Sequence, residues 1–483
     1  MNAYRKSGNY DALLRVVEKD AGILLSSLNP QTVLDDIAAC SVSTLKAHPL
    51  ALLVLMRRMF TWRNIPKMME LKELLLTAIR EQPELSPQER GNLLGECDLI
   101  MRFLCYNDIS AMSRLHRSAS SQMSRLAISI QKSGGWTFDS PSVLMMFYRA
   151  PGELQSALAE MDDCMPHYYK ITDGHGQGAE TIMRAEASFM QGRFTDANIE
   201  LESAYAQIEG NGQENMVLCC DFLAWRLSLH MNIEQRYSFE ERYDALLHKH
   251  NATWLNIWNA TSAYYHALLG ETDKIPSVFA EHQVSAINFL APGKPMMELI
   301  ENQVYLTQGS YAKVIGRSEG QLAVCDAMHY ALVALHVRIQ TAAAYELLGK
   351  HRGARKLLTQ ALADAEPDGF VIPFVENYRY LKPLLTEEIQ SSLVQKIVEL
   401  GETAQRRKST ADRPMIFTAL TEREYELVLL MAERLTNREI AEKMFLSEGS
   451  VKQYINQIYS KLHIEGDGRS KRKRLLSLLS QKY

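Results

Sequence analysis

Apolar residues recur every three or four positions along residues 1–400, separated by polar positions and short breaks. This spacing places apolar side chains on one face of a helix. Alternation of single apolar and polar residues, the pattern of a strand, is scarce in the same stretch. The pattern therefore predicts an all-α region built from many consecutive helices.

One kind of break recurs at a nearly constant interval. Glycine interrupts the helical pattern at Gly192, Gly270, Gly309 and Gly349, about 39 residues apart except for one interval of twice that length. A further break at Met231-Asn232 falls inside the double interval. A repeat of this length predicts a solenoid of helix–turn–helix units, whose concave surface is a place for binding.

Small residues occupy equivalent positions in two of these units. The spacing of the first set equals that of the second: Ala185, Gly192, Ala197 and Ala204 against Ala342, Gly349, Ala354 and Ala361. Small side chains let the two helices of a hairpin approach closely, and glycine ends the first helix. The arrangement resembles the tetratricopeptide repeat in a lengthened form.

Three helix starts follow one another closely in the last 65 or so residues. Thr421 with Glu424 and Thr436 with Glu439 have the spacing of capping boxes, and Ser447 is a third candidate N-cap. These starts predict three short helices.

The connection between the second and third of these helices consists of Phe445 and Leu446 alone. So short a connection fixes the crossing of the two helices. A helix-turn-helix protein uses that crossing to lay one helix over the DNA backbone and the other in a groove.

The third helix, expected over residues 448–462, has two chemically different faces. One stripe is apolar and suits packing: Val451, Ile455, Ile458 and Leu462. The opposite face carries small and polar residues, and two polar residues flank it: Gly449, Gln453, Asn456 and Ser460, with Lys452 and Gln457 beside them. Amides read adenine edges and lysine reads guanine or phosphate, so this face has the chemistry of a DNA reader. A solvated helix face would also be polar, but that alone does not explain the three caps and the two-residue turn.

The charge distribution agrees with this interpretation. The whole chain has a net charge of −4, but from Leu446 onward it has 8 basic and 3 acidic residues. Phosphate binding requires such a local excess of positive charge.

The remaining composition indicates a cytoplasmic protein. The seven cysteines form no Cys-x-x-Cys motif, as is usual in a reducing compartment. Residues 1–10 contain no apolar run of a signal peptide, and no stretch has the length and composition of a membrane span. No catalytic set, metal site or cofactor site is expected.

Four runs in the last 65 residues carry a family resemblance. They are Leu420-Thr421-x-Arg423-Glu424, Asn437-Arg438-Glu439-Ile440-Ala441, Ser447-Glu448-Gly449-Ser450-Val451-Lys452 and Ile458-Tyr459-x-Lys461-Leu462. The segment resembles the LuxR-type helix-turn-helix domain of bacterial regulators, which has four helices. The resemblance implies that Lys452, Gln453 and Asn456 approach base edges. It also implies phosphate or positioning roles for a second set: Thr421, Ser450, Tyr454 and Lys461.

The sequence departs from the family pattern in places. Arg434 stands where the family usually has a glycine after the first helix, and Tyr454 replaces a common histidine. Arg469 and the run 471–474 are unusually basic. This run is interpreted as a phosphate-contacting patch, a solvated helix end, or a nuclear signal if the host is eukaryotic.

The family often dimerises through its last helix. That helix here carries Leu475, Leu476 and Leu479, and the four consecutive cations before them would crowd a dimer seam. A homodimer on DNA is therefore an open possibility.

The helical region resembles the superhelical sensor region of the large MalT-like subgroup of LuxR-type regulators. Residues 187–194 and 366–374 carry this resemblance, which implies that an inducer or a regulatory protein binds there. The subgroup begins with an ATPase domain, but Gly-x-x-x-x-Gly-Lys-Ser/Thr does not occur in this sequence.

One aromatic stripe is a candidate contact for such a ligand or partner. Trp254, Trp258 and Tyr265 lie on one helical face and could stack on a ring-shaped ligand. The alternative, that the stripe packs between helices, is the commoner use of such residues.

We predict an all-α protein with three segments. Residues 1–401 form a tetratricopeptide-like, MalT-like sensor or interaction domain, 402–414 an exposed polar linker, and 415–483 the DNA-binding domain. The predicted function is that of a transcriptional regulator with no enzymatic activity. The alternative is a protein-interaction scaffold whose DNA-binding domain is vestigial.

Overall fold

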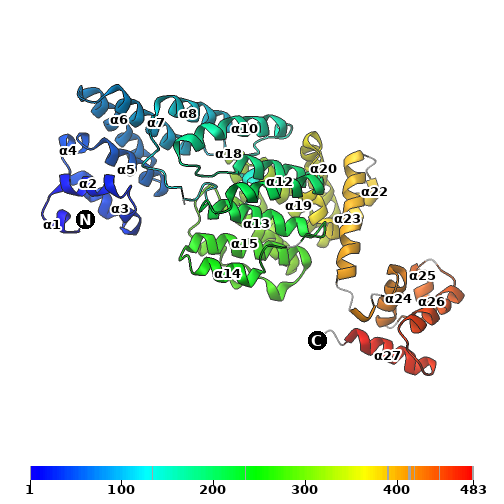
Figure 1. The fold of residues 1–483 in the computed structure, drawn as a ribbon. Coiled ribbons are helices and arrows are strands. Elements are labelled where there is room, and N and C mark those ends of the chain that lie inside the picture. The colour runs from blue at the N-terminus through cyan, green and yellow to red at the C-terminus, as the bar shows by residue number, and fades with distance from the viewer. Residues whose placement is uncertain are drawn as a thin grey trace. The chain divides into compact units, whose positions relative to one another are not determined.

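The structure is a computed structural model, and it describes residues 2–132, 134–233, 235–388, 391–411, 415–417, 419–433, 435–444 and 446–480. The described residues form helices joined by turns and loops, without strands, so the all-α prediction is confirmed for them (Figure 1). Contacts divide the chain into two compact units, Met1–Gly401 and Glu402–Tyr483, called here the helical unit and the carboxyl-terminal unit.

The helices of the first unit vary widely in length, and the last of them continues past Gly401 into the second unit. Their bounds are Asn2–Lys6 (α1), Tyr10–Lys19 (α2), Pro30–Ala39 (α3), Val42–Lys46 (α4), Pro49–Thr61 (α5), Ile65–Glu81 (α6), Pro87–Met101 (α7), Ile109–Gln122 (α8), Val143–Phe147 (α9), Leu154–Ile171 (α10), Ala179–Met190 (α11), Phe194–Ile208 (α12), Glu214–Ser228 (α13), Phe239–Leu247 (α14), Ala252–Leu269 (α15), Ser277–Ala280 (α16), Lys294–Thr307 (α17), Tyr311–Met328 (α18), Ala331–Leu347 (α19), His351–Ala365 (α20), Ile372–Glu376 (α21), Tyr378–Glu388 (α22) and Ser392–Ala411 (α23). Short 3₁₀ helices are Leu24–Ser27 (η1), Arg102–Cys105 (η2), Thr272–Lys274 (η3), Val284–Ala286 (η4) and Glu366–Asp368 (η5). None of these helices, as far as the structure describes them, is both long and apolar enough to cross a membrane.

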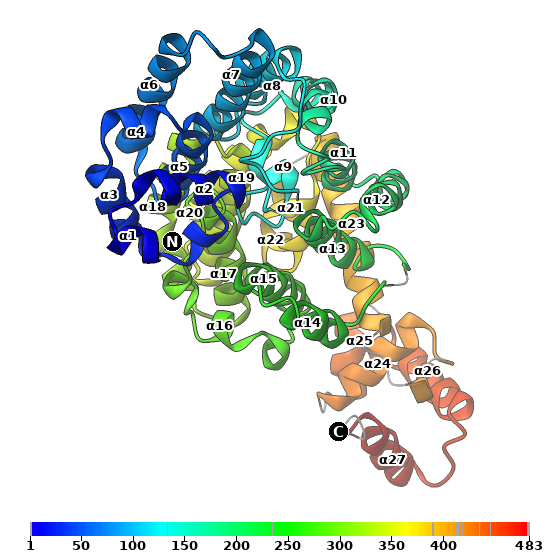
Figure 2. The same ribbon diagram turned by 60° about the vertical axis from the view of Figure 1, so that its left-hand side comes forward.

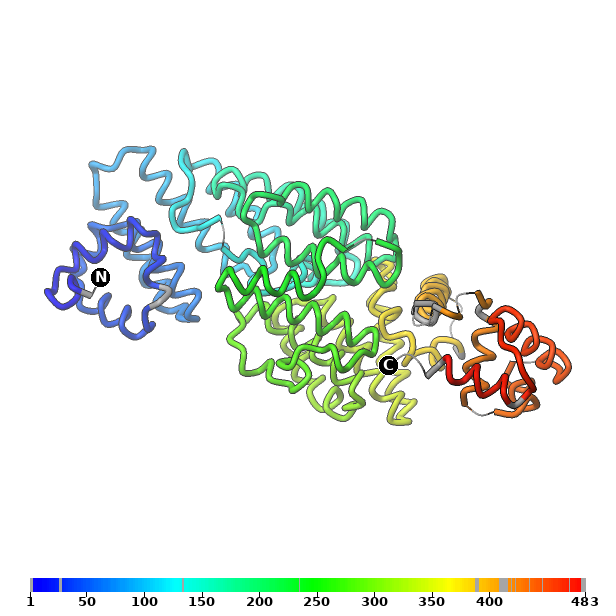
Figure 3. Tube along the Cα trace, turned by 60° about the horizontal axis from the view of Figure 1, so that its bottom comes forward, coloured from blue at the N-terminus to red at the C-terminus, as the bar shows by residue number. Residues whose placement is uncertain are grey.

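Pairs of consecutive helices pack as hairpins along the unit, as Figure 3 shows along the chain path. The turns at Gly192 and Gly349 adopt φ of 72° and 71°, a left-handed conformation that glycine tolerates best. The small residues that were expected between the helices are fully buried: Ala185, Ala197, Ala204, Ala342, Ala354 and Ala361. The helix–turn–helix hairpins are thus present, whereas their assignment to the tetratricopeptide class stays a prediction.

Two short apolar helices occupy the interior of this unit. In Figure 2, α9 and α21 lie inside a ring of longer helices, and both contact α11 and α19. The amide of Val371, just before α21, donates to the Met190 carbonyl at 2.8 Å. Helices α11 and α19, which both short helices contact, are far apart in the sequence.

The structure differs from the sequence-based expectation at three places. Residues 123–142 contain no helix among those described, although short breaks were expected. After Gly270 the second helix of the repeat is replaced by the short pieces η3, α16 and η4, in a stretch that contains Pro276 and His282 with φ of 60°. These backbone constraints interrupt a regular helix.

The third difference concerns the predicted linker at 402–414. The helical pattern does not end at Gly401, because α23 continues to Ala411, and residues 412–414 lie outside the described residues. A Cβ on Gly401 would come within 2.3 Å of the Tyr378 ring, so this glycine permits close packing and does not mark a helix end. Glu402, Ala404, Gln405, Arg406 and Arg407, which follow it, have high helix propensity, so the helix continues although this stretch is polar.

A buried ion pair ties the interior helix α21 to its neighbours. Arg226 Nε of α13 donates to Glu376 Oε1 at 2.8 Å, and their side chains are only 2% and 1% exposed. Tyr264 Oη of α15 donates to the second carboxylate oxygen at 2.8 Å. The guanidinium also lies 4.9 Å from the Phe189 ring centroid, on α11. One arginine therefore links four helices.

Replacing Glu376 by Ala should destabilise the helical unit by about 3–5 kcal/mol, because Arg226 would remain buried without a partner. Urea unfolding followed by circular dichroism measures the loss. The matched control is Glu70→Ala, which removes the exposed partner of Lys67 and should cost less than about 1 kcal/mol. Similar losses for the two variants would contradict the importance given to the buried pair.

Candidate nucleic-acid interface

Beyond the end of α23, the described part of the carboxyl-terminal unit contains four helices around one apolar core. They are Glu422–Ala432 (α24), Asn437–Met444 (α25), Glu448–Lys461 (α26) and Gly468–Ser480 (α27), preceded by the 3₁₀ helix Met415–Phe417 (η6). The core is formed by Phe417, Leu420, Tyr425, Leu427, Val428, Met431, Ile440, Ala441, Met444, Val451, Ile455, Ile458, Tyr459, Ile464 and Leu475. Each helix contributes to it, so no helix of this unit can shift without disturbing the core.

The three predicted N-caps are confirmed. The Thr421 amide donates to Glu424 Oε2 at 2.7 Å, and the Glu424 amide donates to Thr421 Oγ1 at 3.3 Å. In the same way, the Thr436 amide donates to Glu439 Oε2 at 2.7 Å, and the Glu439 amide donates to Thr436 Oγ1 at 3.3 Å. The Ser450 amide donates to Ser447 Oγ at 3.1 Å. These bonds satisfy backbone donors that a helix start would otherwise leave unpaired.

Helix α26 has the two faces that the sequence predicts. Val451, Ile455 and Ile458 are buried in the core, and Leu462 packs against it. Side chains on the other face are exposed: Lys452, Gln453, Asn456, Gln457 and Ser460. A Cβ on Gly449 would meet only Ser447 Oγ, at 3.6 Å, so the backbone at the start of α26 is open to approach. The exposed face of α26 therefore presents a row of amide, hydroxyl and ammonium groups.

Lys461 has a partner that the sequence did not indicate. Its ammonium lies 2.7 Å from Glu424 Oε2, the same oxygen that receives the Thr421 amide. Burial pushes the pKa of Glu424 upward, but Lys461 and the amide and hydroxyl of Thr421 outweigh burial and hold this pKa below its usual value. The carboxylate is charged at neutral pH and joins the start of α24 to the end of α26.

The Lys461 side chain nevertheless remains 40% exposed, whereas Glu424 is 4% exposed. A surface phosphate could therefore reach the ammonium without displacing the carboxylate.

The other predicted positioning residues lie near the core or the caps. Tyr454 is half-buried and packs against the core. Ser450 is half-buried, with its hydroxyl 2.9 Å from that of Ser447. Thr421 is exposed at the start of α24, with its hydroxyl used in the cap. Their contacts to DNA stay predictions.

The four basic residues 471–474, at the start of α27, lie in two different environments. Lys471 lies 5.8 Å from the Tyr459 ring centroid, and Arg472 Nη2 donates to the Leu435 carbonyl at 2.7 Å. Lys473 and Arg474 are exposed. Half of this run therefore stabilises the unit itself, and the other half is free to meet solvent or phosphate.

Several sequence-based expectations cannot be compared with the structure. Arg434 and Phe445 lie outside the described residues, as do the side chains of Arg469 and Leu479. Leu475, one of the leucines of the suggested dimer seam, is fully buried in its own core. A dimer contact through α27 would thus have to use other residues.

The aromatic stripe of α15 is not a free stacking surface. Trp258 is fully buried and its Nε1 donates to the Phe239 carbonyl at 3.1 Å. Tyr265 is half-buried, with ring centroids of Trp225 and Phe239 at 4.9 and 5.5 Å, and Trp254 is half-buried too. The burial of Trp258 favours the alternative that the stripe packs between helices, because α13, α14 and α15 use these rings for their own packing, and a ligand contact by this stripe stays a prediction.

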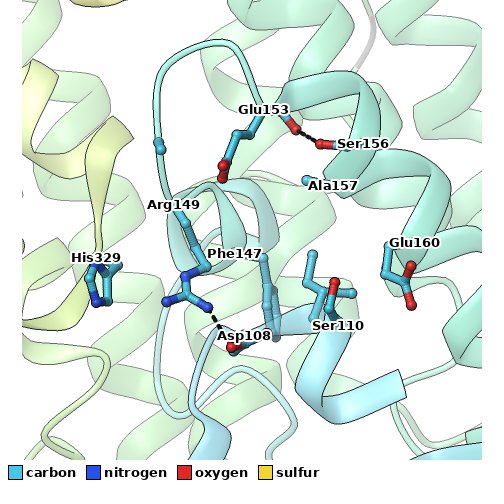
Figure 4. Close-up of a pocket in the computed structure, with 11 residues that line it drawn as sticks. Asp108, Ser110, Phe147, Arg149, Glu153, Ser156, Ala157, Glu160 and His329 are labelled. Carbon is cyan, nitrogen blue, oxygen red and sulfur yellow. Dashed lines mark hydrogen bonds and ion pairs between the residues drawn. The ribbon is translucent and has the colours of Figure 1, made fainter. Parts of the chain in front are cut away.

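The helical unit has instead a polar cavity of about 440 Å³ that the sequence did not reveal (Figure 4). Its charged and ionisable lining comes from three distant parts of the chain: Asp108, Arg149, Glu153, Glu160 and His329. Arg149 Nη1 and Asp108 Oδ2 form an ion pair at 2.9 Å across its base. Asn107, next to Asp108, donates to the Met328 carbonyl at 3.1 Å and holds the walls together.

Comparison with known proteins concerns the carboxyl-terminal unit. Residues 418–469 match the family described as bacterial regulatory proteins, luxR family. The chain is similar to the DNA-binding transcriptional activator DevR/DosR of Mycobacterium tuberculosis, with 38% identity over 58 residues, which are 12% of this chain and 27% of that protein.

Two proteins of Bacillus subtilis show the same likeness. The transcriptional regulatory protein LnrK is 42% identical over 53 residues, 11% of this chain and 24% of LnrK. The transcriptional regulatory protein LiaR is 36% identical over 64 residues, 13% of this chain and 30% of LiaR. The chain spans less than a third of the length of each of these relatives. With its capped helices and the exposed polar face of α26, the carboxyl-terminal unit of this chain is a helix-turn-helix domain of the luxR family.

Proposed function

We propose that this protein is a sequence-specific DNA-binding transcriptional regulator. The observation that carries the proposal is the exposed polar face of α26, held outward by the burial of Val451, Ile455 and Ile458 within a luxR-family domain. The similar proteins from Mycobacterium tuberculosis and Bacillus subtilis are named as transcriptional regulators, which supports the same role here.

Base reading is assigned to three exposed side chains of α26. Gln453 and Asn456 carry amides suited to adenine edges, and Lys452 suits guanine or phosphate. These residues span about 6 Å of helix rise, close to the height of two base-pair steps. One helix can therefore contact neighbouring base pairs in the major groove.

Backbone contacts are assigned to the residues that border this face. Ser450 lies at the start of α26, where helix amides favour an anion, and Lys461 lies at its end. Thr421 and Tyr454 complete the set as positioning residues. Such contacts set register and affinity and carry little sequence information.

The helical unit is proposed to receive the signal. The cavity lined by Arg149, Glu153 and Glu160 supports this role, because it is concave and has charged groups from several segments. An inducer or a regulatory protein bound there would control the DNA-binding unit. A homodimer on DNA is a further element of the proposal.

A second candidate function is a protein-interaction scaffold with a vestigial DNA-binding domain. Arg434, in place of the family's usual glycine, favours it. The intact caps and the single core of the carboxyl-terminal unit favour DNA binding. Gel shifts with the full chain across a salt series separate the two functions, because a scaffold would retain no DNA even at low salt.

Replacing Gln453 or Asn456 by Ala should relax sequence preference, with losses of about 1–3 kcal/mol on the preferred site and little change on random DNA. Competition binding on a selected site and on random duplexes measures both values for each variant. Random DNA is the internal control for folding. Equal losses on both duplexes would contradict the base-reading role.

Replacing Lys461 by Ala should weaken binding to all duplexes and lower the salt slope by about one unit if this ammonium meets a phosphate. The substitution also removes a partner of Glu424, so the melting temperature of the carboxyl-terminal unit should fall. Titrations at several salt concentrations and a melting curve measure the two effects.

Glu424→Gln is the variant that separates these roles. It frees the Lys461 ammonium while keeping an acceptor near Thr421, so stability should fall but DNA affinity should persist. Parallel losses of affinity in Lys461→Ala and Glu424→Gln would show that Lys461 acts only within the fold.

Lys452 has no ion-pair partner in the described part of the chain, so Lys452→Ala should change DNA binding alone.

A further inference from the structure

The cavity of about 440 Å³ in the helical unit is lined by both acidic and basic side chains (Figure 4). Its carboxyl groups belong to Asp108, Glu153 and Glu160, and its guanidinium belongs to Arg149. A concave site of this volume can hold a small molecule. The bonds that these four side chains form within the protein distinguish the charges that the fold uses from those that remain available to a ligand.

Asp108 is fully engaged by the fold. Its Oδ1 accepts from the Ala111 amide at 2.9 Å, at the start of α8, and its Oδ2 lies 2.9 Å from Arg149 Nη1. Burial pushes the pKa of Asp108 upward, but the Ala111 amide and Arg149 outweigh burial and hold this pKa below its usual value. Asp108 is therefore charged at neutral pH, and it balances the charge of Arg149.

The carboxylates of Glu153 and Glu160 are not engaged in this way. Neither forms a hydrogen bond or an ion pair with any residue that the structure describes, and the Glu153 side chain does not cap α10. Ser156 and Ala157 line the cavity together with these two residues, so one face of α10 borders it. Along that face the two glutamates are separated by a rise of about 10 Å. Two negative charges thus border the cavity without a counter-charge from the described chain.

Arg149 retains hydrogen-bond donors although it pairs with Asp108. Its Nη1 serves Asp108, whereas its Nε and Nη2 reach no acceptor in the part of the chain that the structure describes. The side chain is 29% exposed, and Figure 4 shows the guanidinium within the cavity. A guanidinium has five N–H donors, so those that remain can bind a second carboxylate.

The backbone that carries Glu153 is held in place before any ligand binds. The amides on its two sides, those of Gly152 and Leu154, donate to the carboxylate of Asp368 at 2.5 and 3.2 Å. Asp368 is itself buried. A site whose backbone is fixed in this way loses less conformational entropy on binding.

We propose that this cavity binds a basic α-amino acid, such as lysine, ornithine or arginine. The two cationic groups of the ligand match the carboxylates of Glu153 and Glu160, and its carboxylate matches the remaining donors of Arg149. Ile109 and Phe147 line the same cavity and offer apolar surface to the methylene chain. Both glutamates would repel an anion, and a monovalent cation would leave one of them unbalanced.

This inference rests on the proposed function, because it names the class of ligand for the cavity to which that function assigns the signal. The chemistry of the ligand is nevertheless tested without DNA, since the residues involved all belong to the helical unit.

Isothermal titration of the full chain tests the site. Lysine, ornithine and arginine are titrated separately at constant ionic strength, and we expect saturable binding with one site per chain for at least one of them. Two analogues of the tightest ligand should bind about tenfold more weakly or worse. The first is its decarboxylated amine (cadaverine, putrescine or agmatine), which lacks the group for Arg149. The second is norleucine, which lacks the side-chain cation.

Two variants locate the response. Glu153→Gln and Glu160→Gln each remove one charge and keep the size of the side chain, so each should weaken binding of the tightest amino acid about tenfold or more. The matched control is Glu319→Gln. Glu319 is exposed on α18, outside the cavity lining, and has no ion-pair partner among the described residues. This control loses the same charge and should bind as the wild-type chain does. Melting curves of all three variants verify folding.

The proposal is overturned if none of the three amino acids gives saturable binding to the wild-type chain. Equal binding of the decarboxylated amine or of norleucine also overturns it, because one of the assigned contacts would then be absent. A loss in Glu319→Gln equal to the losses in Glu153→Gln and Glu160→Gln would assign the response to general charge and would likewise exclude this site.

Gel shifts with the same preparation separate this inference from the proposed function. A chain that retains DNA but binds none of the amino acids contradicts the ligand class alone. A chain that binds an amino acid but retains no DNA, even at low salt, contradicts the regulatory function and leaves the site standing.

Discussion

The DNA-binding unit depends on the burial of one narrow apolar stripe. A helix of 14 residues such as α26 is marginal by itself in water, so its helicity comes mainly from packing. Burying Val451, Ile455 and Ile458 stabilises the helix and also fixes its rotation about its own axis. Because the rotation is fixed, Gln453 and Asn456 must face outward. The same contacts that fold the unit therefore present its polar face.

Charged groups reinforce this arrangement where apolar packing ends. One carboxylate oxygen of Glu424 accepts from the Thr421 amide, at the start of α24, and from the Lys461 ammonium, at the end of α26. The two helices therefore share a single carboxylate. In the helical unit, Arg226 and Glu376 have the same kind of arrangement around α21.

Local signals in the sequence predicted the features that depend on neighbouring residues. Capping spacings located the starts of α24, α25 and α26, and the wheel of α26 separated its buried from its exposed side chains. The left-handed glycines at Gly192, Gly309 and Gly349 marked hairpin turns correctly, whereas no regular second helix follows Gly270. Polarity was misleading beyond Gly401, because polar residues, several of them half-buried, continue α23 as a helix. The buried fate of Trp258 also depends on Phe239, which belongs to another helix.

Features that join distant segments could not be predicted in this way. Glu424 and Lys461 are 37 positions apart, and the cavity brings together Asp108, Arg149 and His329. The spacing of apolar and polar residues along one helix carries no information about which distant segments come into contact.

The two interior helices have a consequence for how this protein can evolve. An open array of repeats gains or loses a unit at little cost, because each repeat contacts only its neighbours. Here Tyr148, at the end of α9, donates to Asp368 at 2.5 Å and accepts from the Ala331 amide at 3.2 Å. Inserting or deleting one hairpin between these points would pull apart bonds that span about half of the chain. The bonds of Tyr148 therefore constrain the number of hairpins between Tyr148 and Asp368, where substitution disturbs less of the structure than insertion does.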